Sequence, residues 1–198
     1  MTKNLSTAER IIALVDEMRE NSSEMRMWKN IPLAQEGIRL LRLLDDPDET
    51  PLGKAMACNA ICEQLPEYDV PRFVLDLLQY ERAWLVQSGD EAEATGPTLG
   101  EVDADIRRLS DYIDTEHVST EEFIKRHHRM LKFDPIERTP QWEAIYYEAE
   151  QECDRRLGDT PRGMGFCFSH WSTFRQVLAE RGIHWRTPSE LNPRVMFD

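Results

Sequence analysis

The chain has 198 residues, and its 24 basic and 37 acidic side chains give a formal net charge of −13 with histidine neutral. A hydrophobic content of 40% is enough for a folded core, so we exclude a collagen-like, coiled-coil or fully disordered protein. The pI is near 4.9, so the protein surface is on average negatively charged and repels phosphate backbones and anionic lipids. We therefore expect neither nucleic-acid binding nor membrane association.

Helix start and stop signals recur along the first 88 residues. Ser6 and Glu9 have the spacing of a capping box, and the apolar residues after them, Ile11 and Ile12 included, form one helical stripe. Three later starts each carry a proline that fits a first helical position, followed by apolar residues at three-to-four spacing. The four predicted helices cover residues 6–18, 32–44, 51–65 and 71–85.

An acidic stretch follows these helices. No basic residue lies between Arg82 and Arg107, whereas six acidic residues accumulate there beside glycines and a proline. We predict that residues 89–100 form a linker between an N-terminal helical part, 1–88, and a C-terminal helical part, 101–198. One continuous domain is the alternative.

The second half of the chain carries four more helical patterns. Apolar residues from Leu99 to Ile113 alternate at spacings of three and four, and Ser119 with Glu122 caps the next pattern. Thr139 opens a helix that ends at Gly158, and a further helix ends at Gly182. With no convincing strand, the sequence predicts an all-α protein: an irregular bundle of seven to eight helices with an ordered, irregular C-terminal tail.

The tail itself carries local signals. Thr187, Pro188 and Glu190 have the spacing of a capping box, but Pro193 leaves room for about one helical turn. Four apolar side chains are costly to leave in water at a chain end, so we expect them to dock on the helical body, with the first of them largely buried. These residues are Trp185, Val195, Met196 and Phe197.

The C-terminal segment from Asp154 differs in composition from the rest. It holds seven arginines, no lysine and five acidic residues, a net charge of +2, together with several aromatic residues. Arginine both stacks on aromatic rings and pairs with carboxylates. We interpret this segment as one that docks internally on acidic parts of the chain.

Within that segment, a glycine-containing helix start offers a candidate ligand site. Two glycines let backbone N–H groups approach a ligand, and the helix dipole with a nearby arginine would hold an anion such as phosphate. The alternative is that the glycines only let two helices cross closely. The candidate ligand-binding residues are Arg162, Gly163, Gly165, His170 and Trp171.

The same region holds a cysteine and a histidine one helical turn apart. A cysteine at a helix N-terminus has a lowered thiol pKa. Cys167 and His170 are three residues apart, which places them on one helix face, so they are the candidate catalytic pair. Adding Cys58 and Cys62 completes a four-ligand zinc set, but those two belong to a packed helix, and we predict no metal and no cofactor. The acidic residues after Pro140 are interpreted as a solvated face.

Two functions remain open on these grounds. The first is a non-catalytic interaction protein, such as an adaptor, inhibitor or immunity-type protein, whose acidic surface recognises a basic protein partner. The second is an enzyme or sensor that binds a small anionic or phosphorylated ligand near Arg162 and His170, which requires a pocket at that helix start.

The expected compartment is the cytoplasm. No apolar run approaches the roughly 20 residues that cross a bilayer, and the first ten residues lack the pattern of a secretory signal. The cysteines are too few for a disulfide scaffold and lie among apolar neighbours, so we predict free thiols. They are Cys58, Cys62, Cys153 and Cys167.

Overall fold

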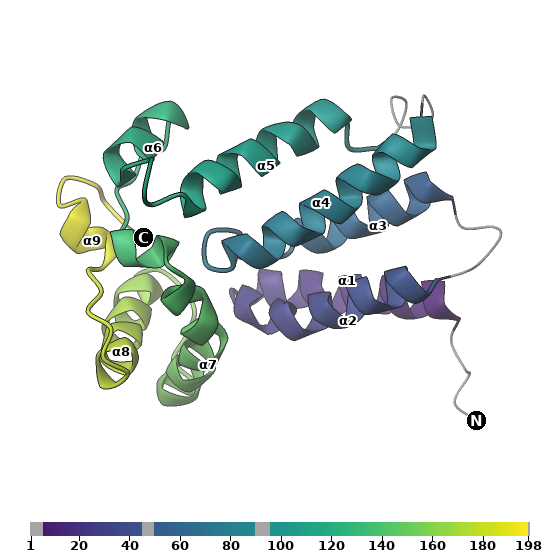
Figure 1. Cartoon of the computed structure of the whole chain (residues 1–198). Coiled ribbons are helices and arrows are strands. Elements are labelled where there is room, and N and C mark those ends of the chain that lie inside the picture. Colours follow the sequence, from purple (N-terminus) through teal and green to yellow (C-terminus); the bar gives the residue numbers. More distant parts are fainter. Residues whose placement is uncertain (1–5, 45–49, 90–95, 198) are drawn as a thin grey trace. The chain divides into compact units, whose positions relative to one another are not determined.

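The computed structural model describes residues 6–44, 50–89 and 96–197. Within these residues it contains nine α-helices, short 3₁₀ helices and no strand, which confirms the all-α prediction (Figure 1). The ninth helix is the single turn predicted in the tail. None of the helices in these ranges is long and apolar enough to cross a membrane.

The chain divides into two compact units, residues 1–110 and residues 111–198. The helix α5 (Leu99–Ile113) contributes to both units and begins inside the stretch predicted as a linker. Residues 90–95, at the centre of that stretch, lie outside the described residues. The division of the protein by a linker at 89–100 therefore stays a prediction.

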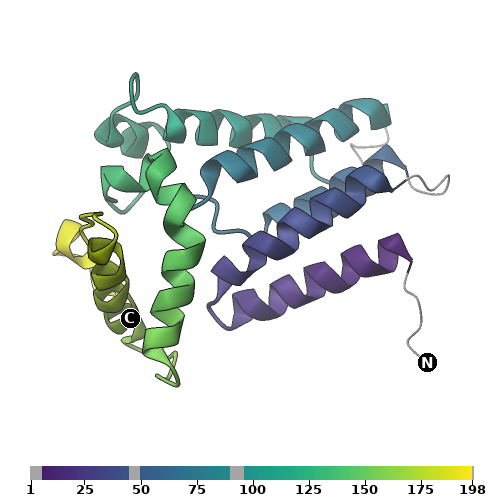
Figure 2. The same ribbon diagram turned by 60° about the horizontal axis from the view of Figure 1, so that its bottom comes forward.

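Unit 1 is built from two helix pairs and the first part of α5. The helices α1 (Thr7–Ser23) and α2 (Asn30–Leu43) lie side by side, as do α3 (Pro51–Cys62) and α4 (Pro71–Ser88) (Figures 1 and 2). Their facing apolar stripes form the core, in which Met18, Leu41, Ile61, Leu77 and Leu85 are fully buried.

Local capping signals fix most of the helix starts in unit 1. Ser6 and Glu9 form the predicted capping box, and the Thr50 hydroxyl accepts a hydrogen bond from the Gly53 amide. The predicted start at Pro32 is wrong by two residues. The 3₁₀ turn Met27–Lys29 leads directly into α2, so the helix already begins at Asn30.

Unit 2 contains the end of α5, followed by α6 (Thr120–Arg126), α7 (Pro140–Leu157), α8 (Phe166–Glu180) and α9 (Pro188–Leu191). Helices α7 and α8 pack side by side (Figure 2). Aromatic rings fill the core of this unit. Phe174 of α8 meets Trp142 of α7 edge to face with ring centroids 5.7 Å apart, and Trp185 meets Phe174 in the same way at 5.6 Å.

A buried arginine joins the end of α5 to the rest of unit 2. Arg138, in the 3₁₀ helix Pro135–Arg138, is only 2% exposed, and its guanidinium donates hydrogen bonds to the carbonyl oxygens of Asp111, Tyr112 and Asp114. The last carbonyls of a helix have no partner within the helix. The guanidinium therefore supplies donors that α5 lacks.

The C-terminal tail is ordered, but only part of its predicted docking is correct. The capping box of Thr187 and Glu190 is present, and Trp185 is 7% exposed, as predicted. Val195 is 44% exposed and Met196 92% exposed, so their predicted docking is wrong.

Hydrogen bonds account for this difference. The Asn192 side chain bonds the backbone N–H and carbonyl of Lys132, which holds the tail without burial of its last apolar residues. Beyond this anchor, Phe197 packs edge to face on Trp171, with ring centroids 5.1 Å apart.

Candidate functional site

The two glycines before α8 do not serve a close helix crossing. A Cβ atom added at Gly163 or at Gly165 meets nothing within 4 Å, so the alternative of two tightly crossed helices is wrong. Gly165 has a different role. Its φ of 80° lies in the left-handed region, where a glycine pays no Cβ penalty, and it immediately precedes the first residue of α8.

The guanidinium of Arg162 has partners within unit 2. It pairs with the carboxylate of Asp154 on α7 and lies over the Phe166 ring, 4.7 Å from the ring centroid. The side chain is 16% exposed. An anionic ligand at the predicted site would have to compete with Asp154 for this charge.

His170 of α8 contacts α7. Its Nε2 lies 2.9 Å from Oε2 of Glu150, and its ring stacks on Phe174 with an interplanar angle of 12°. Cys153 completes a group in which three potential ligand atoms lie within 4.8 Å of one another. The prediction of a solvated acidic face is thus wrong for Glu150, which is buried.

The thiol in this group is a poor nucleophile. Burial raises the pKa of Cys153 to about 12, and the nearby carboxylates of Glu150 and Asp154 act in the same direction. A nucleophilic cysteine requires a lowered pKa. The structure therefore brings a cysteine to His170, but in surroundings that disfavour its thiolate.

The arginines of the C-terminal segment pair with carboxylates of the same unit. Arg156 bonds Glu152 and Glu180, and two others, Arg175 and Arg186, pair with Glu190 and Asp134. The arginines beside Glu152 lower its pKa to about 2. Much of the basic charge in this segment is thus balanced within unit 2.

A cavity of about 500 Å³ lies in unit 2, away from the predicted ligand residues. Arg175, His184 and Arg186 line it, beside the C-terminal half of α8. The predicted ligand residues lie before and within the first half of α8, and none of them lines this cavity. Both arginines of the cavity are the ones already paired with Glu190 and Asp134.

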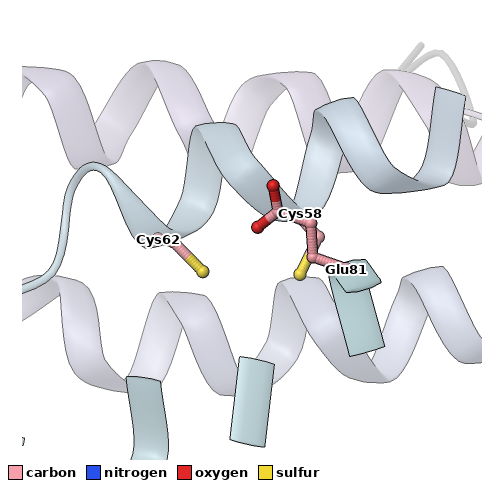
Figure 3. A group of neighbouring side chains, drawn as sticks. All are labelled: Cys58, Cys62 and Glu81. Carbon is pink, nitrogen blue, oxygen red and sulfur yellow. The ribbon is translucent and has the colours of Figure 1, made fainter. Parts of the chain in front are cut away.

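In unit 1, two thiols and a carboxylate converge between α3 and α4. Cys58 and Cys62 lie one turn apart on α3, and Figure 3 shows their sulfurs close to the Glu81 carboxylate of α4. The three potential ligand atoms lie within 4.8 Å of each other. The Cys58 thiol also donates to the Leu77 carbonyl oxygen at 3.4 Å.

The Glu81 carboxylate has unusual surroundings. The residue is 0% exposed, and neither carboxylate oxygen has a hydrogen-bond partner in the described part of the chain. Burial raises the pKa of Glu81 to about 7, against a smaller opposing effect of the Asn59 side chain. A hydrogen bond with Cys58 and burial raise the pKa of Cys62.

The residues of the four-ligand zinc set considered from the sequence belong to different units. Cys58 and Cys62 are grouped with Glu81 in unit 1, whereas His170 is grouped with Glu150 and Cys153 in unit 2. The sequence reasoning missed Glu81, Glu150 and Cys153 as partners. All four cysteines are free thiols, as predicted.

A small apolar hollow lies on the surface of unit 1. We name it the α1 hollow; its volume is about 130 Å³, and it is lined by Ala8, Ile11, Ile12, Leu41, Leu44 and Ala57. Ile12, which the sequence placed in the core stripe, is 61% exposed, because Ile11, Val15 and Met18 form the buried face of α1.

Comparison with protein-family models, curated proteins and solved structures found no match to the chain.

Proposed function

We propose that the protein is a non-catalytic interaction module, in which the α1 hollow of unit 1 binds a basic partner protein. The observation that carries this proposal is an exposed isoleucine beside an apolar hollow on a strongly acidic unit. Residues 1–110 hold 12 basic and 21 acidic side chains, a net charge of −9, whereas residues 111–198 hold 12 and 16, a net charge of −4.

The charges close to the hollow fit a basic partner. Glu9 and Asp16 lie three and four residues from Ile12 on α1, and these spacings place them on the same helix face. Both are exposed. A partner segment with lysine or arginine around an apolar side chain would match this pattern, and the net charge of the unit would speed its encounter.

The hollow fits one apolar anchor. Its volume of about 130 Å³ is close to that of cavities that accommodate a single small apolar group. Burial of one large apolar side chain contributes roughly 1.5 to 3 kcal/mol. We therefore expect a transient complex, in which one apolar contact fixes the position and long-range electrostatics set the association rate.

The alternative, an enzyme or sensor of a small anion, has less support. Of its candidate residues, Arg162 is paired with Asp154 and His170 lies beside Glu150. The Cys153 thiol, which lies near His170, is disfavoured as a nucleophile because burial raises its pKa. None of these observations calls for a bound anion.

We infer a cytoplasmic location from the cysteines. Cys58 and Cys153 are buried as free thiols, and Cys62 and Cys167 are half-buried. Such thiols persist in a reducing compartment.

A peptide selection tests the proposed function. Random peptides are displayed against the immobilised chain and counter-selected against an Ile12→Glu variant. Val86→Glu is the matched control, because Val86 is 54% exposed on α4 of the same unit and the change adds the same charge without touching the hollow.

We expect enriched peptides with a net positive charge and an apolar anchor, which bind the native chain and the Val86→Glu variant equally. Their affinity for the Ile12→Glu variant should fall about tenfold or more, equivalent to the loss of one buried apolar contact. Peptides that bind all three proteins alike, or a selection that enriches no peptide, would overturn the proposal.

A further inference from the structure

We propose that Cys58, Cys62 and Glu81 form a binding site for a thiophilic divalent cation, for which Zn²⁺ is the best match. The site lies between α3 and α4 in the interior of unit 1 (Figure 3). It is independent of the α1 hollow and of the proposed interaction function.

The distances fit a metal centre. A tetrahedral Zn²⁺ ion with Zn–S of about 2.3 Å and Zn–O of about 2.0 Å holds its ligand atoms roughly 3.5 to 3.8 Å apart. The two sulfurs and a Glu81 oxygen already lie within 4.8 Å of one another. Side-chain movements on the order of 1 Å would bring them to ligand distances.

Glu81 supplies a second and independent reason. A buried carboxyl group without a hydrogen-bond partner loses its interactions with water and gains nothing in return, which destabilises the folded state. Glu81 is fully buried, neither of its oxygens has a hydrogen-bond partner among the described residues, and one of its oxygens lies within 4.8 Å of both sulfurs. A cation at this point would bind both oxygens or one of them.

The contrast with the other cysteine group supports this choice. In unit 2, Glu150 already bonds His170, so those polar atoms satisfy one another. In unit 1 the Glu81 carboxylate lies beside two thiols, which are weak donors, and near the Asn59 side chain, and neither of its oxygens has a hydrogen-bond partner among the described residues. The cluster of Cys58, Cys62 and Glu81 is therefore the stronger candidate for binding a metal ion.

The donor set selects the ion. Two thiolates favour Zn²⁺ or Cu⁺ over Mg²⁺ and Ca²⁺, which take oxygen ligands. A divalent ion neutralises more of the charge of two thiolates and a carboxylate than Cu⁺ does, and buried net charge is costly. Three protein ligands leave the fourth tetrahedral position to water or to an added ligand.

Protons must leave when the metal binds. Each thiol transfers its proton to solvent as its sulfur bonds the ion, and the carboxyl group does the same where it is protonated. No electrons are transferred, because Zn²⁺ has no redox chemistry at such a site.

The test uses Co²⁺ as a spectroscopic probe and Zn²⁺ as the competitor. The full chain is treated with a chelator and a phosphine reductant, and Co²⁺ is added both to the folded protein and during refolding. We expect one Co²⁺ per chain, with thiolate-to-cobalt charge-transfer absorption and visible d–d bands of a tetrahedral site, all displaced by Zn²⁺. We also expect Zn²⁺ to raise the melting temperature.

Variants assign the ligands. Glu81→Gln keeps both thiolates and the side-chain shape, so the charge-transfer band should remain while the affinity falls at least about tenfold. The Cys58→Ser and Cys62→Ser double variant should lose the band. Cys167→Ser, a half-buried thiol in unit 2, is the matched control and should bind like the native chain. Far-ultraviolet circular dichroism checks that every variant is folded.

Three results would overturn the proposal: no cobalt spectrum by either route of addition, a spectrum that persists in the double variant, or equal binding by the native chain and Glu81→Gln. A spectrum that is lost instead with Cys153→Ser would place the metal in the group of Glu150 and His170, and would also contradict it.

Discussion

Replacement of Glu137 by glutamine should remove the part of the pH dependence of protein stability that this carboxyl group contributes. Glu137 is largely shielded from solvent in unit 2, where its Oε1 accepts hydrogen bonds from the Trp185 indole at 2.7 Å and from the Asp134 amide at 3.2 Å. Burial raises the pKa of Glu137 from 4.5 to about 7, because desolvation outweighs these two hydrogen bonds. The folded protein therefore holds this proton more tightly than the unfolded chain does.

The sign and size of the effect follow from this shift. Below about pH 4.5 the carboxyl group is protonated in both states, and its contribution to stability is fully present. As the pH rises to about 7 the unfolded chain releases the proton first, so this contribution is lost. A shift from 4.5 to about 7 corresponds to about 3 kcal/mol in the free energy of unfolding.

A glutamine cannot ionise, and its amide oxygen can accept from both Trp185 and Asp134. The Glu137→Gln variant should therefore gain stability relative to the native chain between pH 5 and pH 8, by about 2 to 3 kcal/mol. Urea unfolding followed by tryptophan fluorescence at both pH values measures the difference. Titrating groups that do not interact with Glu137 act equally in the two proteins and cancel from it.

Glu148→Gln, the same replacement at an exposed position of α7, is the control for the loss of one negative charge. If the stability difference between Glu137→Gln and the native chain stays constant from pH 5 to pH 8, or falls, burial does not govern the proton at Glu137. The reasoning above would then be refuted.

Three further substitutions test the packing. Arg138→Met removes the guanidinium donor from the backbone carbonyls of Asp111 and Tyr112 at the end of α5 and should lower stability by about 3 kcal/mol in urea unfolding; a loss under about 1 kcal/mol would contradict this. Phe197→Ala removes a ring contact and should lower the melting temperature by about 2 to 4 °C in calorimetry, whereas Met196→Ala should leave it unchanged; equal effects would argue against the difference in their packing. Gly165→Ala forces a side chain into a positive φ and should cost about 1 kcal/mol, whereas Gly163→Ala should cost nothing measurable; a neutral Gly165→Ala would show that this backbone conformation is not required.

Helix starts were predictable because their signals are local. The side chains of Ser6 and Thr187 bond backbone groups three residues away, so the pattern in the sequence already contains both partners. The burial of Trp185 followed from its size alone. Its hydrogen bond to Glu137, 48 residues away along the chain, did not.

The candidate sites depend on contacts that no local pattern contains. Cys58 and Cys62 lie on one helical face by their spacing, but their meeting with Glu81 depends on how α3 is aligned with α4. One signal was available: Glu81 falls four residues after Leu77 and four before Leu85, on the apolar stripe of α4. An acidic residue at such a position indicates either a buried carboxyl group or a ligand.

The same limit applies to the surface. Ile12 was assigned to the core because it is apolar and follows Ile11, yet adjacent residues on a helix point about 100° apart, and α1 buries only one stripe. His170 was paired with Cys167 by spacing along one helix. Tertiary packing also brings it to Glu150 and Cys153 of α7, which no spacing along one helix predicts.

An NMR titration of the ¹⁵N-labelled chain with a selected basic peptide tests the proposed function most directly. If the α1 hollow is the binding surface, amide shifts will concentrate on its lining residues, will weaken steeply with added salt, and will be absent in the Ile12→Glu variant. Those residues are Ala8, Ile11, Ile12, Leu41, Leu44 and Ala57. Shifts centred on residues 162–171, or shifts that persist in the Ile12→Glu variant, would contradict it.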